Sequence, residues 1–182
     1  MEERHRNEGV RRLYSLRFLL PTPFSEREVY CQYMTRWLAI SNRTNSDITV
    51  KKHLWGVPKR AINQISKTRP GDTLLVYVGQ QVIDKDTTLP PAITGCFEIT
   101  SEVYEDTKPV FTAPPKLGAE VFPLRIKLKT VQIFDPPVEF KPLIPRLAFI
   151  TNKKQWSGHI RGQAMRTIPE EDHALIMAHS HP

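Results

Sequence analysis

The stretch Trp37–Arg60 constrains the fold more than any other part of the chain, because two tryptophans enclose a run of hydrogen-bonding side chains. Its first residues, Trp37–Ile40, are apolar throughout, which predicts a buried strand. The polar run Ser41–Ser46 then predicts a loop at the end of that strand, where ligand sites commonly lie. Asp47 is a good N-cap for a short helix that follows. A flat aromatic side chain, Trp55, is thus expected close to a polar loop.

The strongest strand pattern lies further along the chain. Thr73–Gly79 is apolar on both faces, which predicts a central strand of a sheet. Ala92–Glu102 predicts another strand, in which Gly95 marks a bulge or the close approach of a ligand or another backbone. The polar residues between them, Gln80–Pro91, predict a hairpin loop.

Apolar and basic residues alternate in Glu120–Phe134, which predicts a long strand or a pair of strands. Arg125, Lys127 and Lys129 would then form a basic stripe opposite a buried face. Such a stripe is a candidate track for phosphates. It is equally consistent with a solvated outer face, whose cations deter edge pairing.

Short helices are expected around these strands. Pro58 opens a surface helix that places apolar side chains, Ile62 among them, on its inner face. Phe140–Leu147 predicts a short apolar helical segment. Thr167 and Glu170 have the spacing of a capping box at the start of a C-terminal helix.

The remaining segments are read from proline, glycine and short apolar runs. Asp135–Pro137 is expected to end the long strand, and Phe149–Ile150 to form a brief buried strand. Tyr104–Ala119 is too proline-rich for a helix and too long for a tight turn, and long ordered loops often line sites. Asn152–Arg166 predicts an ordered loop. Five or six strands with short helices between them favour an α+β domain built on a small, partly open barrel.

A set of short motifs follows in a distinctive order. The motifs are Met34–Trp37, Trp55–Val57, Pro70–Asp72 before a strand, Gly95, Phe149–His159, Gly162–Arg166 and Ile168–Asp172. This order resembles the EVE domain of archaeal and bacterial proteins, a PUA-like fold related to the YTH readers of methylated adenine in RNA. The resemblance covers about residues 34–178. It implies a PUA-like, partly open β-barrel of five to six strands with short flanking helices, a choice that strand patterns alone leave open.

One position departs from the family pattern. The family commonly has Asn-Trp in its first loop, where this chain has Asn45-Ser46. If that tryptophan is a pocket wall in relatives, this chain lacks the wall.

The two ends of the chain differ from its centre. Residues 1–33 have two interpretations. In the first, they form an arm whose arginines contact nucleic acid or a second subunit. In the second, translation starts at Met34 and residues 1–33 are an upstream extension; we favour this interpretation because the family pattern begins at Met34. An arm, if translated, is expected to pack weakly. Residues 179–182 form a short tail after the domain 34–178.

Net charge and cysteine content indicate which kind of binding partner and which cellular compartment to expect. The net charge is +7 and the pI is about 9.5, which favours a polyanionic partner, although a basic surface that binds nothing has the same composition. No apolar run is long enough to cross a bilayer. Cys31 and Cys96 suit reduced thiols rather than a disulfide framework. We expect a cytoplasmic protein, without membrane contact, that is a monomer rather than an oligomer.

The candidate site residues fall into two groups. Stacking aromatics and hydrogen-bonding side chains could form a base pocket, walled by Trp55. Its candidate members are Trp55, Ser41, Asn42, Asn45, Tyr77 and Trp156. Cations and polar side chains near Trp156 suit contacts with phosphate and backbone. The candidates are Lys153, Lys154, Ser157, His159, Arg166 and Asn152. Trp37 is assigned to the core.

The favoured function is a non-catalytic module that binds RNA or DNA and recognises a modified base in an aromatic-walled pocket. No catalytic residue, metal ligand or cofactor is predicted, since the sequence has no glycine-rich phosphate loop and no nucleophile elbow. The alternative is an enzyme acting on a modified nucleobase or nucleoside, as in the related ASCH-type amidohydrolases, with Lys, Thr or Glu side chains in the same slot. A third possibility is a protein-interaction domain that self-associates through residues 1–33.

Overall fold

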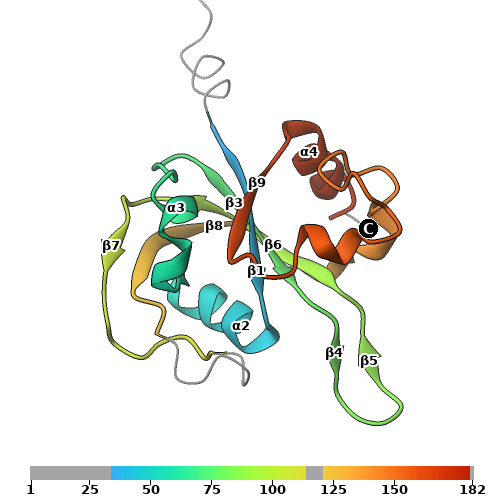
Figure 1. Ribbon diagram of the computed structural model, residues 1–182, viewed down its shortest axis with the longest axis horizontal. Helices are drawn as coiled ribbons and strands as arrows, with labels where there is room; N and C mark the ends of the chain where they lie inside the picture. The colour runs from blue at the N-terminus through green and yellow to red at the C-terminus, as the bar shows by residue number, and fades with distance from the viewer. Residues whose placement is uncertain (1–33, 114–120, 181–182) are drawn as a thin grey trace, which may run out of the picture. The chain divides into compact units, whose positions relative to one another are not determined.

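The computed structural model describes residues 34–113 and 121–180, so the expectations for 1–33 and for the last two residues of the tail lie outside it. Its elements are β1 (Arg36–Ser41), α2 (Arg43–Lys52), β2 (Leu54–Val57), η1 (Lys59–Ala61), α3 (Ile62–Ile65), β3 (Thr73–Val78), β4 (Gln81–Val82), β5 (Thr88–Leu89), β6 (Ala92–Ile99), β7 (Tyr104–Glu105), β8 (Leu124–Glu139), η3 (Lys141–Leu143), η4 (Trp156–His159), β9 (Met165–Ile168) and α4 (Glu170–Ala178). Figure 1 follows them along the chain.

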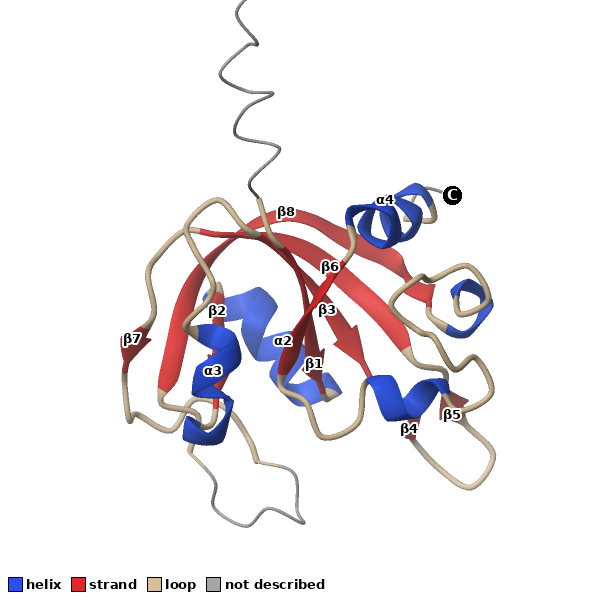
Figure 2. Ribbon diagram, turned by 45° about the horizontal axis from the view of Figure 1, so that its top comes forward, coloured by secondary structure: helices blue, strands red, loops and turns tan. Residues whose placement is uncertain are grey.

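One mixed sheet organises the fold. In the described residues its strands follow the order β2-β8-β6-β3-β1-β9, with β7 paired to β8, and β4 and β5 form a separate ribbon. β1 and β3 are parallel, and every other pair is antiparallel. The sheet curls into a partly open barrel, with α2 under its arch (Figure 2). The expected α+β class and partly open barrel are confirmed.

Two hydrophobic clusters lie on opposite faces of the central strands. Leu38 and Leu75 belong to one cluster, whereas Trp37, Leu74 and Val76 belong to the other. Side chains alternate between the faces of a strand, so a strand covered on both sides must be apolar throughout. The predicted central position of β3 and the core position of Trp37 are therefore confirmed.

The predicted loop at Ser41–Ser46 is wrong, since the helix α2 begins at Arg43. Asn42, not Asp47, is its N-cap, and the Asn42 Oδ1 accepts a hydrogen bond from the backbone N–H of Asn45 at 2.8 Å. The helix buries polar side chains, Ser46 and Thr49 among them, against the sheet. Packing under the arch outweighs the low helix propensity of Asn, Ser and Thr.

The basic stripe on β8 is wrong at Arg125, which is buried. The connection after β7 covers this end of the strand, and its Asp106 forms an ion pair with Arg125 at 2.8 Å. Lys127 and Lys129 are exposed as expected. Asp135–Pro137 does not end β8, which continues to Glu139.

Three smaller expectations are also wrong. Phe149–Ile150 is buried but forms no strand, and Ile62 is 51% exposed on the outer side of α3. Thr167 lies in β9, so it makes no capping box, and α4 starts after Pro169 without a side-chain cap.

Gly95 lies where the register between β6 and its neighbours shifts. A Cβ there would come 2.9 Å from the backbone oxygen of Gln132. The expected close approach of another backbone is confirmed. No helix among the described residues has the length and apolar character needed to cross a membrane.

Candidate functional site

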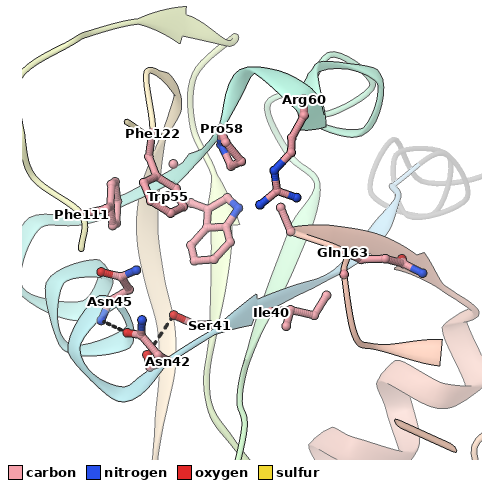
Figure 3. Close-up of a pocket in the computed structure, with 13 residues that line it drawn as sticks. Ile40, Ser41, Asn42, Asn45, Trp55, Pro58, Arg60, Phe111, Phe122 and Gln163 are labelled. Carbon is pink, nitrogen blue, oxygen red and sulfur yellow. Dashed lines mark hydrogen bonds between the residues drawn. The ribbon is translucent and has the colours of Figure 1, made fainter. Parts of the chain in front are cut away.

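A cavity of about 270 Å³ opens beside the C-terminal end of β1. Its lining comes from parts of the chain that are far apart in sequence (Figure 3). The lining residues are Ile40, Ser41, Asn42, Asn45, Trp55, Gly56, Pro58, Arg60, Phe111, Phe122, Gly162, Gln163 and Ala164. We call this cavity the Trp55 pocket. Its volume is close to the lower end of the roughly 300–1,000 Å³ range of ligand sites, which suits a single flat ring system.

An aromatic wall forms one side of the Trp55 pocket. Trp55 on β2 meets Phe111 edge to face, with ring centroids 6.3 Å apart, and Phe111 lies 5.9 Å from Phe122. Gly56 makes this packing possible, because a Cβ at this position would come 2.5 Å from Phe111 Cε2. The wall therefore joins a strand to the long connection between β7 and β8.

Asn45 fixes the position of this connection. Its Nδ2 donates to the carbonyl oxygen of Thr112 at 2.9 Å, and its Oδ1 accepts from the Thr112 N–H at 2.8 Å. Asn45 was predicted to read a base edge. It does line the pocket, but its carboxamide already makes two hydrogen bonds to backbone.

Arg125 fixes the same connection from the other side. Its guanidinium donates to the carbonyl oxygens of Phe122, at 3.1 Å, and of Lys108. The guanidinium carbon also lies 5.9 Å from the centre of the Phe111 ring. A buried cation that donates to backbone carbonyls and a carboxylate restricts the loop that carries the aromatic wall.

The polar side of the pocket comes from the start of α2 and from Arg60. The Ser41 hydroxyl donates to the carbonyl oxygen of Asn42 at 3.0 Å, which leaves the Ser41 Oγ able to accept. The Asn42 Oδ1 accepts the capping hydrogen bond, so the NH₂ group of that side chain is the donor that Asn42 can offer to a ligand. Arg60 adds a cation at the rim.

The indole N–H of Trp55 is a buried donor in the wall of the site. Trp55 is 3% exposed, and its Nε1 has no hydrogen-bond partner in the described part of the chain. Figure 3 shows this nitrogen on the side of the ring nearest Arg60. A buried donor without an acceptor costs about 1–3 kcal/mol. The pocket therefore holds a donor that a ligand's acceptor could satisfy.

Tyr77 and Trp156, also predicted for the base pocket, lie elsewhere. Both line a second cavity of about 590 Å³, which we call the Trp156 pocket, together with Ser157 and Arg161. It shares Ile40 and Ser41 with the Trp55 pocket. Burial raises the pKa of Tyr77 to about 12, against the opposing effect of Arg161, so the phenol is neutral at physiological pH.

The predicted phosphate contacts are spread over the segment Asn152–His159 and strand β9, which contains Arg166. Arg166 donates to the carbonyl oxygen of His159 at 2.6 Å and lies 4.7 Å above the Phe149 ring. Lys153 donates to the carbonyl oxygen of Leu147 at 2.5 Å. His159 Nε2 accepts from the Asn152 N–H at 3.2 Å.

These contacts give Lys153, Asn152 and His159 structural roles within the loop before β9, and they tie Arg166 on β9 to that loop. Lys154 is exposed and lines neither pocket, whereas Ser157 lines the Trp156 pocket.

Ser46, the position at which the resemblance leads us to expect tryptophan, is not among the residues that line the Trp55 pocket. It is 2% exposed, and its Oγ lies 2.9 Å from the Thr94 Oγ1. It lines a different cavity of about 310 Å³, between α2 and β8. In this chain, position 46 therefore faces away from Trp55.

The sequence interpretation missed Phe111, Phe122, Arg60 and Gln163 as lining residues. The signal for Phe111 was its place in a long proline-rich connection, a kind of segment that often lines sites. Arg60 lies in the segment after Pro58, for which the sequence predicts a surface helix and no ligand contact. Nothing in the sequence periodicity points to Gln163. It lies at the pocket because its neighbour Ala164 accepts a hydrogen bond of 2.9 Å from the Ile40 N–H through its backbone oxygen.

Comparison with known proteins places this geometry in context. A sequence model of the EVE domain matches residues 35–179. A UPF0310 protein of Pyrococcus abyssi is 46% identical over 143 residues, which cover 79% of this chain and 97% of the relative.

Two solved structures share the fold. One is human THYN1 in complex with DNA containing 5-methylcytosine, with a TM-score of 0.52 and 14% identity over 81% of this chain and 98% of that chain. The other is the YTH domain-containing protein mmi1 in complex with RNA, with a TM-score of 0.51 and 10% identity over 79% and 80% of the two chains. The PUA-like architecture expected from the motifs is confirmed.

Proposed function

Because this chain belongs to the EVE domain family, we propose that it is a non-catalytic nucleic-acid-binding module that takes one modified base into the Trp55 pocket. Two structural neighbours support nucleic acid as the ligand, since one was solved with 5-methylcytosine DNA and the other with RNA. The net charge of +7 also suits a polyanion.

The unpartnered indole N–H of Trp55 carries the proposal. It is a buried donor in the wall of a cavity that opens beside further donors and acceptors. The bases of nucleic acids are flat and present carbonyl oxygens and ring nitrogens as acceptors in their own plane. A base that enters the pocket can satisfy the Trp55 Nε1 while Asn42 and Ser41 meet other atoms of its edge.

The apolar part of the lining supports recognition of a methyl group. Ile40, Pro58 and Phe111 all line the pocket and offer carbon surface to a ligand. Burying one methyl group contributes about 1 kcal/mol. A modified base should therefore bind about fivefold more tightly than its unmodified form, and the stacking and hydrogen bonds supply the rest.

The enzyme alternative has weaker support. In this alternative the slot presents Lys, Thr or Glu side chains to a modified base, and none of these is among the described residues that line the Trp55 pocket. The polar groups there are hydroxyl, carboxamide, indole and guanidinium, which bind through hydrogen bonds. Turnover of a modified nucleoside by the purified protein, abolished by Asn42→Ala, would establish the alternative.

The test is calorimetric titration with matched single strands of DNA and RNA that contain 5-methylcytosine, N6-methyladenine or no modification. We expect one modified strand to bind best, and Trp55→Phe to weaken it about tenfold, because phenylalanine retains a ring but lacks the N–H. Trp37→Phe is the matched control, since it removes a buried indole N–H that donates to Asp72, outside the pocket. It should lower stability and leave affinity unchanged. Equal affinity of Trp55→Phe and the parent for every strand would refute the proposal.

A further inference from the structure

The Trp156 pocket lies on the other side of the end of β1 from the Trp55 pocket. Ile40 and Ser41 line both cavities. The segment that contains Arg161 and Gly162 also lies between the two cavities, since Arg161 lines the Trp156 pocket and Gly162 lines the Trp55 pocket. The hydrogen bond from the Ile40 N–H to the Ala164 oxygen joins the two segments. The cavities are thus neighbours that share Ile40 and Ser41 as lining residues.

The chemistry of the Trp156 pocket differs from that of the first. Two exposed cations, Arg161 and Lys141, lie at its edge, and no carboxylate is among its described lining residues. Tyr77 adds no negative charge, because its pKa is about 12. The electrostatic character of this cavity therefore favours a phosphate group over a neutral ligand.

The aromatic side chains of the Trp156 pocket are held in place by packing. The ring centroids of Trp156 and Phe140 are 5.8 Å apart, and Phe140 meets Tyr77 edge to face at 4.9 Å. Trp156 remains partly exposed toward the cavity. A fixed, partly exposed tryptophan next to two cations matches the stacking platforms of single-strand binders.

We propose that the Trp156 pocket holds the nucleotide adjacent to the base in the Trp55 pocket, so that one single strand passes over Ile40 and Ser41 and fills both cavities. Successive nucleotides are joined by one sugar and one phosphate, so the pocket for the second nucleotide must lie directly next to the pocket for the first. Ile40 and Ser41, which line both cavities, meet this condition. Arg161 contacts the phosphate, and Trp156 stacks on the second base or its sugar. This proposal rests on the proposed function and adds a second nucleotide to the site.

The test compares ligands of increasing length on the full chain. The probes are the preferred modified mononucleotide, the dinucleotides extended on its 5′ or its 3′ side, and the trinucleotide. We expect extension on one side to tighten binding about tenfold, as one stacked base would. In Trp156→Ala and Arg161→Gln this gain should fall to twofold or less, while the mononucleotide binds as it does to the parent.

The salt dependence separates a phosphate contact from a structural effect. Loss of one contact lowers the slope of log affinity against log salt by about 0.7 for a single strand. We expect this change in Arg161→Gln, and not in Arg146→Gln, which removes an exposed arginine that lines neither pocket. Arg161 is exposed, so its variant remains informative if Trp156→Ala does not fold.

Two results would overturn the proposal. If extended strands gain the same affinity in both variants as in the parent, the second nucleotide lies elsewhere and the Trp55 pocket stands alone. If the parent binds neither the modified mononucleotide nor the longer strands, the proposed function fails and the second site fails with it.

Discussion

The contact between Gly56 and Phe111 gives a prediction that the structure makes quantitative. In Gly56→Ala the new Cβ would lie 2.5 Å from Phe111 Cε2 and 2.9 Å from Cδ2. Carbon atoms normally meet at about 3.5–4.0 Å, so the Phe111 ring must move by about 1 Å. Forced packing of this kind costs roughly 1–3 kcal/mol. Replacing glycine by alanine in a strand returns about 0.5–1 kcal/mol, which leaves a net loss of about 1–2 kcal/mol.

A double-mutant cycle with Phe111→Ala isolates this contact. In that background the ring is absent, so Gly56→Ala should be neutral or slightly stabilising. The free energies of unfolding come from urea titrations of the four proteins. Gly158→Ala is the matched control, because its Cβ would meet no atom within 4 Å. If Gly56→Ala costs the same with and without Phe111, the reasoning about the aromatic wall is refuted. Affinity for a modified strand should fall only where Phe111 is displaced or removed.

Three further predictions concern the surroundings of the site. Asn45→Ala removes both hydrogen bonds to Thr112, so it should lower the free energy of unfolding by about 1–2 kcal/mol and weaken ligand binding. Urea titration measures the first effect and calorimetric titration the second. The control Asn63→Ala, at an exposed position, should change neither quantity. Arg125→Met leaves Asp106 without its buried partner and should lower the free energy of unfolding by roughly 3 kcal/mol in urea titrations. If Arg125→Met costs as much in an Asp106→Asn background as in the parent, the ion-pair argument is contradicted. Burial and nearby positive charge lower the pKa of His173 from 6.5 to about 4. The unfolded state therefore takes up the proton first, and stability should fall as the pH drops from about 6.5 toward 4, by about 1–2 kcal/mol for a partly exposed ring. His173→Gln should flatten this part of the pH–stability curve.

The central strand and the core tryptophan could be predicted because both are buried among apolar side chains, and such surroundings favour apolar residues at each position. β3 is covered on both faces, so its apolar run has one simple explanation. The polar run after β1 has no such constraint. Ser, Asn and Thr favour turns locally, and only the sheet above α2 decides that Ser46 and Thr49 are buried in a helix.

The candidate site was predictable in part for a related reason. Trp55, Ser41 and Asn42 lie close in sequence, so their proximity in the pocket could be inferred from the chain order. Phe111 and Phe122 reach it through an irregular connection whose path depends on Arg125, a residue that alternation assigned to the solvent side. Tyr77 and Trp156 were grouped with Trp55 by residue type, which carries no information on which side of β1 a side chain lies.

The hydrogen bond between Ile40 and Ala164 links walls that are more than a hundred residues apart in the chain. The Trp55 pocket is therefore complete only when β9 has joined β1, and a chain that stops before Gly162 lacks part of the pocket lining. Any ligand that binds there binds the whole native domain and not a fragment of it. At a concentration one hundred times its Kd, such a ligand would stabilise the entire domain by about 2.7 kcal/mol. On the proposed function, binding of nucleic acid would therefore stabilise the folded domain as a whole.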